Sequence, residues 1–189
     1  MEQKINQNDT QNNYQKDLLI NRFSPLKEII ELGKKCDKSG HCCSFGGGFI
    51  LEHELDDLSR NLKMSKDELI KNYLDEKISF NTKHYKFKSK KTSKPFGPCI
   101  FLDNNLCKIH QFKPLHCKVG NCCKKYGEKL SLWFALNHFV NPNDPDSIRQ
   151  WAIYLKTHPT IPGGELKDLV NDEEKLNKIL NHDVLWNFN

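Results

Sequence analysis

The sequence lacks the C-x2-C pairs by which a zinc knuckle turns two sulfurs toward one tetrahedral ion. It is nevertheless rich in cysteine, since eight cysteines fall in two groups and none lies between Cys43 and Cys99. Thiols with independent packing roles would be scattered along the chain. The clustering predicts a soft-metal site assembled from two segments. The first segment contains Cys36, Cys42 and Cys43, and the second contains Cys99, Cys107, Cys117, Cys122 and Cys123.

Long apolar runs are also missing. No run approaches the roughly 20 apolar residues that a membrane span needs, so no membrane partner is expected. The first 15 residues are polar and have no apolar centre of the kind found in signal peptides. We therefore expect a cytoplasmic protein, in a reducing compartment where thiols serve as metal ligands rather than as disulfides. A disulfide framework would require an export route that the sequence does not reveal.

Recognisable catalytic patterns are absent as well. The chain has no Ser-His-Asp order, nucleophile elbow or phosphate-binding loop, so we assign no catalytic residue. The formal charge is +5 at pH 7, and it falls if metal is counted, because each four-thiolate iron–sulfur cluster adds about −2. The remaining charge is a weak argument for nucleic acid. The expected partner is instead an unidentified redox or metal-transfer partner.

The hydrophobic pattern predicts a mainly α-helical α+β fold with a small β-hairpin. We expect a disordered tail over 1–15 and one compact metal-binding domain over 16–189, with its metal ligands inside 36–123 and a helical part over 124–189. The predicted helices cover 18–32 with a break near Pro25, 51–62, a segment capped by Ser65, 130–136, and segments opening at Asp144 and Asn171. A strand is predicted over 84–90, and a hairpin over 99–107 that turns at 103–105.

The cysteine spacing leaves the metal open. Thiolates bind zinc, copper(I) and iron–sulfur clusters, and eight thiols are enough for two four-sulfur sites or for one site with spares. Adjacent cysteines such as Cys42 and Cys43 usually point in different directions, so one of each pair is expected to serve a second site or none. From spacing alone an iron–sulfur cluster, zinc and structural thiols all stay possible.

Three segments carry a resemblance to a known family. They read SGHCC, FILEHELDDLSRNLKMSKDELIKNYL and GPCIFLDNNLCKIHQFKPLHCKVGNC, in this order. Together they resemble the YkgJ-like cysteine-cluster proteins, which are described as a zinc- or iron-chelating domain or as iron–sulfur proteins. The segment after residue 129 looks like an archaeal-type subgroup of that family. The resemblance covers at least 36–123 and implies a [4Fe-4S] cluster or Zn²⁺ as the cofactor.

The resemblance also implies which residues bind the metal. Carried over residue by residue, it gives ligand roles to Cys36, Cys42, Cys43, Cys99, Cys107, Cys117 and Cys122. The chain departs from the family pattern at Ser39, where the family has its second cysteine. A serine oxygen is a harder and less acidic ligand than a thiolate. Cys123 has no counterpart in the pattern, and it either supplies the missing sulfur or is a spare thiol.

Other residues have simpler readings. His41 and His110 stand close to cysteines and are alternative ligands, although packing or a hydrogen bond is the simpler role for each. His116 is expected at the surface. The basic run over 83–94 has two interleaved aromatics, a pattern that can bind single-stranded nucleic acid. It more simply predicts a strand with one buried face and one solvated lysine face.

Overall fold

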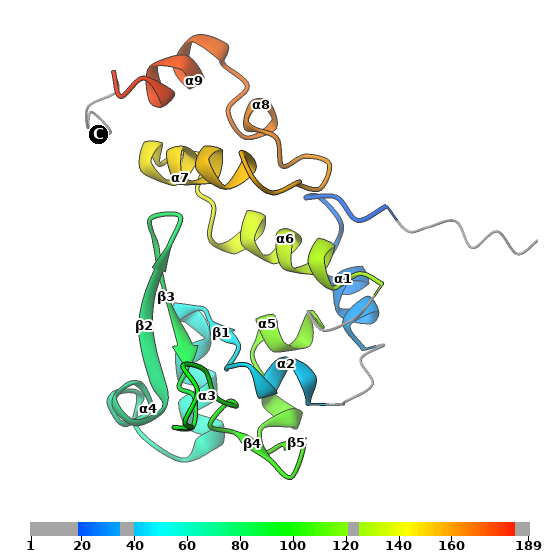
Figure 1. The fold of residues 1–189 in the computed structure, drawn as a ribbon, viewed down its shortest axis with the longest axis vertical. Helices are drawn as coiled ribbons and strands as arrows, with labels where there is room; N and C mark the ends of the chain where they lie inside the picture. The colour runs from blue at the N-terminus through cyan, green and yellow to red at the C-terminus, as the bar shows by residue number, and fades with distance from the viewer. Residues whose placement is uncertain (1–18, 35–39, 121–124, 184–189) are drawn as a thin grey trace, which may run out of the picture.

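The computed structural model describes residues 19–34, 40–120 and 125–183. The tail over 1–15 therefore lies outside the described residues, as do Cys36, Ser39, Cys122 and Cys123. The described part is compact and of mixed α+β type. Helices α6 to α9 form one half, and a small sheet, a hairpin and several short helices form the other half (Figure 1).

The elements follow one another in this order along the chain. They are α1 (Leu26–Gly33), α2 (His41–Ser44), β1 (Phe49–Ile50), the 3₁₀ helix η1 (Glu52–Glu54), α3 (Leu55–Leu62), α4 (Lys66–Tyr73), β2 (Leu74–Ser79), β3 (Thr82–Phe87), β4 (Leu102–Asp103), β5 (Leu106–Cys107), the 3₁₀ helix η2 (His110–Phe112), α5 (Leu115–Lys118), α6 (Gly127–His138), α7 (Pro145–Leu155), α8 (Leu166–Leu169) and α9 (Glu173–Leu180). The longest described helix, α6, has 12 residues, and no described helix has the length and apolar character to cross a membrane.

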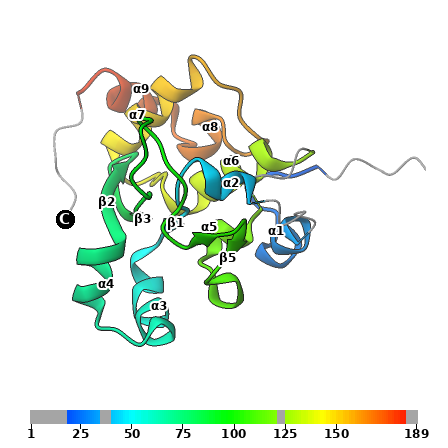
Figure 2. The same ribbon diagram turned by 60° about the horizontal axis from the view of Figure 1, so that its bottom comes forward.

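A three-stranded antiparallel sheet organises the first half. Strand β3 lies at its centre, between β1 and β2. Ile50, Tyr85 and Phe87 are buried in a cluster with residues of α3 and α4. Helices α3 and α4 lie next to each other (Figure 2), and α4 leads directly into β2.

A second, two-stranded hairpin carries part of the second cysteine group. In this hairpin β4 and β5 pair Leu102 with Cys107 and Asp103 with Leu106. The turn residues Asn104 and Asn105 both have positive φ, 44° and 62°. Asparagine tolerates this left-handed conformation better than most residues, so the two asparagines make the tight turn possible. The predicted hairpin is confirmed in a shorter form, over 102–107, and Cys99 lies outside it, where it forms a bridge with Ser89.

The helical half has its own apolar core. Trp151, Phe134 and Ile148 are almost completely buried there, in a cluster that also contains residues of α1, α8 and α9. One part of it comes from the first half, because Val119 at the end of α5 is fully buried in this cluster. The segment that carries Cys117 is therefore held against the helical half.

Several predicted boundaries need correction. Residues 19–24 are not helical, and α1 begins at Leu26, because a proline inside a helix would lack the N–H of its hydrogen bond and clash with the preceding turn. The chain leaves α4 after Tyr73, and Leu74 begins β2, a strand that the sequence analysis missed. The last helix is capped by Asp172 rather than by Asn171, since the Asp172 carboxylate accepts a hydrogen bond from the Lys175 amide at 2.9 Å.

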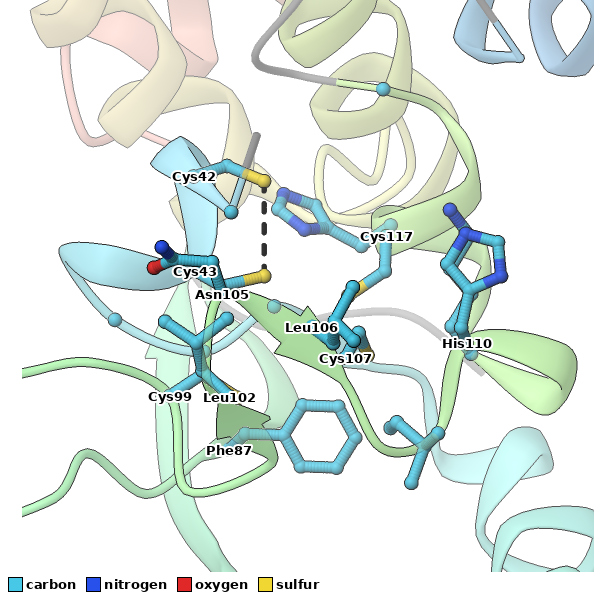
Figure 3. A pocket seen from close by; sticks show the side chains of 18 residues that line it. Cys42, Cys43, Phe87, Cys99, Leu102, Asn105, Leu106, Cys107, His110 and Cys117 are labelled. Carbon is cyan, nitrogen blue, oxygen red and sulfur yellow. Dashed lines mark hydrogen bonds between the residues drawn. The ribbon is translucent and has the colours of Figure 1, made fainter. Parts of the chain in front are cut away.

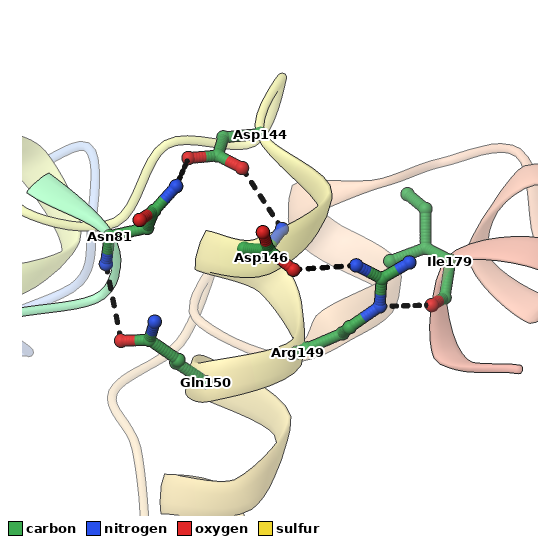
Figure 4. A network of polar contacts seen from close by, with 6 residues as sticks. All are labelled: Asn81, Asp144, Asp146, Arg149, Gln150 and Ile179. Atoms are coloured by element: carbon green, nitrogen blue, oxygen red, sulfur yellow. Dashed lines mark hydrogen bonds and ion pairs between the residues drawn. The ribbon is translucent and has the colours of Figure 1, made fainter. Parts of the chain in front are cut away.

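A polar network joins the two halves at the tip of the β2–β3 hairpin (Figure 4). The Asp144 carboxylate caps α7 by accepting from the Asp146 amide at 2.9 Å, and it also accepts from the Asn81 side-chain amide at 2.6 Å. Further along α7, Arg149 donates to Asp146 and to the Ile179 carbonyl oxygen, both within 2.7 Å. One aspartate thus ties the hairpin tip to the start of α7.

Replacing this aspartate tests both of its roles. We expect Asp144→Ala to lower the free energy of unfolding by about 1–2 kcal/mol, because the helix loses its cap and Asn81 loses an acceptor. Asp144→Asn separates the two roles, since its one amide oxygen can still accept from the Asp146 amide and cap the helix, whereas its NH2 group replaces the second oxygen, which accepts from Asn81. We therefore expect its stability to lie between those of the parent and the alanine variant. Urea unfolding of the three proteins measures the effect, and an alanine variant as stable as the parent would contradict it.

Candidate metal centre

All five cysteines in the described part of the chain line one cavity of about 390 Å³ (Figure 3). They come from four places in the fold. Cys42 and Cys43 lie on α2, Cys107 ends β5 and Cys117 lies on α5, while Cys99 precedes β4. No disulfide joins any of the five. The predicted meeting of the two cysteine groups is confirmed for these residues.

The adjacent cysteines on α2 do not diverge as expected. The Sγ atoms of Cys42 and Cys43 lie 3.9 Å apart and face the same cavity (Figure 3). Zn–S bonds of about 2.3 Å place tetrahedral sulfurs about 3.8 Å apart. The expectation that the two side chains point in different directions was therefore wrong for this pair, while the assignment of one member to a second site or to none stays a prediction. The single helical turn over 41–44 keeps the two side chains close enough to bind the same metal.

A backbone hydrogen bond joins the two cysteine groups directly. The Cys99 amide donates to the Cys43 carbonyl oxygen at 2.7 Å. The chain before Cys99 is also fixed, because the Lys90 amide donates to the Pro98 carbonyl oxygen at 2.7 Å and Ser89 forms a bridge with Cys99. The thiol of Cys99 is thus positioned by β-type hydrogen bonds on both sides, and its residue is 5% exposed.

Helix α5 brings the fifth thiol into place. Its first amide, at Leu115, donates to the Glu54 carboxylate at 2.7 Å, and the same side chain accepts from the Leu51 amide. Gly48 lies directly against the thiol, since a Cβ added there would be 2.2 Å from the Sγ of Cys117. A side chain at residue 48 would occupy the place of the sulfur. This glycine therefore keeps space for a sulfur in the cavity wall.

A contact between two glycines sets the base of the site. A Cβ on Gly33, the last residue of α1, would lie 2.1 Å from the Lys118 carbonyl oxygen. A Cβ on Gly120 would lie 2.6 Å from the Cα of Gly33, and Gly120 also has a positive φ of 76°. The backbones approach this closely only because neither residue has a side chain. Two chain segments that each lead into a cysteine-bearing stretch therefore meet here.

Burial favours the protonated thiols of Cys99, Cys107 and Cys117 in the absence of a cation. Desolvation raises the pKa of Cys117 well above its usual range, and the neighbouring thiols of Cys99 and Cys107 raise it further. Burial also raises the pKa of Cys99 and that of Cys107. Lys90 and Lys113 oppose the rise at Cys99 and Cys107 respectively. A positive ion in the cavity would reverse this balance, because thiolates are stabilised by a bound cation.

The histidines near the cysteines differ from one another. His116 is half-buried rather than exposed as expected, because its ring packs edge-on against Phe49 and Phe134, each with centroids 4.8 Å away. Burial lowers the pKa of His116 to about 4, and the Lys86 charge acts in the same direction. His116 lines the cavity as a neutral ring. His110 also lines the cavity, but it is exposed.

The five thiols line one cavity, but they do not meet at a single point. In the described ranges, no three Cys, His, Asp or Glu side chains converge closely enough to hold one ion. The expected ligands Cys36 and Cys122, and the two residues in question at 39 and 123, lie outside those ranges. The donor chemistry nevertheless fits a soft metal, because five thiols line the cavity and none of its described lining residues is Asp or Glu.

Fold and cavity define a small α+β protein with a thiol-lined pocket. A family model, CxxCxxCC, described as "Putative zinc- or iron-chelating domain", matches residues 35–125. Over these residues, just under half of the chain, the protein is similar to that cysteine-cluster family, which confirms the resemblance seen in the sequence and supports a metal-binding role. The archaeal-type subgroup stays a prediction. The curated proteins and the solved structures contain no match to the chain.

Proposed function

We propose that the chain binds an iron–sulfur cluster of the [4Fe-4S] type in the thiol-lined cavity and uses it in electron transfer, sensing or metal handling. The observation that carries the proposal is the convergence of all five described cysteines on one cavity. One such cluster needs four thiolates, and these would come from among the seven cysteines that the family pattern implies: Cys36, Cys42, Cys43, Cys99, Cys107, Cys117 and Cys122. A cytoplasmic location belongs to the same proposal.

The size of the cavity supports a cluster over a single ion. About 390 Å³ is on the order of ten water volumes. A four-coordinate zinc ion needs far less room, since its sulfurs lie about 2.3 Å from the metal. A polyatomic inorganic core uses such a space, and thiolates are the ligands that hold it.

When bound, a cluster supplies one-electron chemistry at a potential set by its charge, its hydrogen bonds and its exposure to solvent. The protein controls these three quantities through the cavity wall. Phe87 and Ile109 give it an apolar floor, and Lys113 contributes a positive charge. Cys42 is exposed, so the cavity opens to solvent on the α2 side. This arrangement suits a centre that communicates with a partner rather than a sealed structural site.

Purification without oxygen tests the proposal. We expect brown protein that contains iron and acid-labile sulfide, with broad absorption near ~400 nm from sulfur-to-iron charge transfer in thiolate clusters. The measurement combines the absorption spectrum with metal and sulfide analysis. Colourless protein with stoichiometric zinc would overturn the cluster assignment.

Zinc is the second candidate, and one distance favours it. The 3.9 Å between the Sγ atoms of Cys42 and Cys43 is close to the sulfur–sulfur edge of a single tetrahedral zinc site. In that case the site would hold α2 against the second cysteine group without chemistry of its own. The same metal analysis separates the two candidates.

The departures from the family pattern give a further prediction. We expect Cys123→Ala to keep its full metal content, because a compensating thiol would have to arrive from another segment with its sulfur in the right direction. We expect Ser39→Cys to raise metal content or cluster stability. Metal and sulfide analysis of both variants measures this. Loss of metal in Cys123→Ala, with no gain in Ser39→Cys, would show that Cys123 is the substitute ligand.

A further inference from the structure

The mouth of the cavity carries exposed apolar side chains. Phe45, Phe96 and Leu106 are 58%, 46% and 68% exposed, and we call these three residues the mouth rim. Leu106 lines the cavity, and Phe45 directly follows α2, which carries two of the thiols. Single exposed apolar residues are ordinary, but a group of large ones around an opening marks an interaction surface.

Contacts between neighbouring side chains and segments link the three residues into one surface. The rings of Phe45 and Phe96 lie 5.7 Å apart, and the His41 ring lies 5.2 Å from that of Phe45. Gly40, the residue before α2, lies against the hairpin turn, because an added Cβ would be 3.3 Å from the Asn105 carbonyl oxygen. Residue 105 precedes Leu106 in the chain. The start of α2 and the hairpin tip are therefore neighbours on the same side of the cavity.

Positive charge lies beside the mouth rim. From residue 80 to residue 120 the sequence has nine lysines and one carboxylate, Asp103, which pairs with Lys108 at 3.2 Å, while Lys83 pairs with Glu76 of β2 at 2.8 Å. The Lys94 ammonium lies 5.8 Å from the centroid of the Phe96 ring. Lys113 lines the cavity. One lysine thus lies next to the exposed apolar side chains and another lies in the cavity wall.

We propose that the mouth rim is the docking surface of an acidic protein that exchanges electrons or metal with the cavity. This inference rests on the proposed function for the nature of the exchange, but the docking stands on the surface itself. Protein interfaces combine an apolar centre with a polar margin, and complementary charge guides the partners together. The partner's face should therefore carry carboxylates around an apolar centre of its own.

Nucleic acid is the competing occupant. Lysines with exposed rings can bind single strands through phosphate contacts and base stacking. Leu106 offers no ring to stack on, although it is the most exposed of the three and is the one that lines the cavity. An aliphatic contact point at the opening fits a protein side chain better than a base.

Binding measurements with defined probes test the proposal. The purified protein is titrated with an acidic plant-type ferredoxin, with basic cytochrome c as the control of opposite charge, and with an oligothymidine strand. We expect salt-dependent binding of the ferredoxin and none of cytochrome c. Phe96→Ala combined with Leu106→Ala should weaken the ferredoxin complex about tenfold or more, because apolar contacts at the centre of an interface dominate its affinity.

Charge-reversal variants test whether the lysines near the mouth rim attract the partner, or whether only the overall charge of the protein does. Lys91→Glu combined with Lys94→Glu should slow association strongly, whereas Lys156→Glu with Lys167→Glu, exposed lysines at the α7–α8 end, should have only a small effect. Equal effects of the two pairs, or no ferredoxin binding, would overturn the docking proposal. Oligothymidine binding that exceeds ferredoxin binding and is lost in the Phe96 and Leu106 variant would replace it with nucleic acid.

Metal analysis of every protein keeps the two proposals apart. Ferredoxin binding by protein that lacks iron and sulfide would uphold the docking surface and overturn the cluster. Iron–sulfur protein that ignores the ferredoxin would uphold the cluster and overturn the docking surface. Variants that keep the metal content and the thermal stability of the parent exclude misfolding as the cause of lost binding.

Discussion

Removing the metal, or its proposed ligands Cys99 and Cys107, is expected to loosen the cysteine-bearing half of the chain while α6 and α7 stay folded. The elements around the cavity are too short to be stable alone. Helices α2 and α5 have four residues each, and β4 and β5 have two each. An isolated helix is marginal even at about 12 residues, because forming its first turn is unfavourable. A metal bound by thiols from several of these elements would therefore hold them together.

The expected loss is large because the thiols are far apart in the chain. A metal that joins α2 to α5 closes a long loop, and its binding free energy becomes folding free energy. Loss of about 5 kcal/mol would lower the midpoint of thermal unfolding by on the order of 10–20 °C for a protein of this size. Circular dichroism gives that midpoint. Amide hydrogen exchange should show protection lost over 99–118 and kept over 127–155.

A thermodynamic cycle provides the control. Cys99→Ala combined with Cys107→Ala should lower the free energy of unfolding much more in metal-loaded protein than in chelated protein. Only the metal-loaded protein loses two bonds to the metal. Equal costs in both backgrounds would mean that the two thiols contribute by packing alone. Chelated parent protein as stable and as compact as the loaded form would contradict a folding role for the metal altogether.

Gly48→Ala should remove metal binding at a smaller cost in stability. The new methyl group would lie 2.2 Å from the Sγ of Cys117, so the thiol has to leave its place in the cavity. The flexible end of a side chain gives way more easily than backbone. We expect the free energy of unfolding to fall by about 1–3 kcal/mol, which is typical of overpacking. We also expect the protein to lose at least half of its bound metal. Metal analysis and urea unfolding of the same preparation measure both effects.

Gly164→Ala is the matched control for this variant. A Cβ there would lie 2.4 Å from the Thr160 hydroxyl oxygen and 2.8 Å from a methyl carbon of Leu136, in the helical half of the protein. Overpacking of similar severity should reduce stability and leave the metal content of the folded protein unchanged. If both glycine variants lose metal equally, the loss reflects general destabilisation and residue 48 has no special place in the site.

The sequence predicted the features that depend on local chemistry. Ser65 caps α4 as expected, since its hydroxyl accepts from the Glu68 amide at 3.1 Å, and Asp144 caps α7. Capping depends on residues within three positions of each other, so it is visible in one sequence. The hairpin turn is visible for the same reason. The grouping of cysteines also pointed correctly to one meeting place for the described thiols.

Features set by distant contacts were missed. Strand β2 has five consecutive residues outside the core after Leu74, so it shows no alternation, and it is held by its pairing with β3. Strand β1 has two residues and gives no periodic signal. The burial of His116 depends on Phe49 and Phe134, which lie far away in the sequence. No local pattern around residue 116 could have indicated these neighbours.

The contact between Gly33 and Gly120 has a consequence for how this chain could be rearranged. The family match runs from 35 to 125, so it begins and ends close to the point where these two glycines touch. A unit whose two ends lie side by side can be grafted into a surface loop of another protein without stretching its host, and domain insertion succeeds at such sites. The cysteine-bearing segment therefore has the geometry of a domain that can be inserted into another protein. A new scaffold would have to cover Val119 and Leu51, which this segment buries in the helical core.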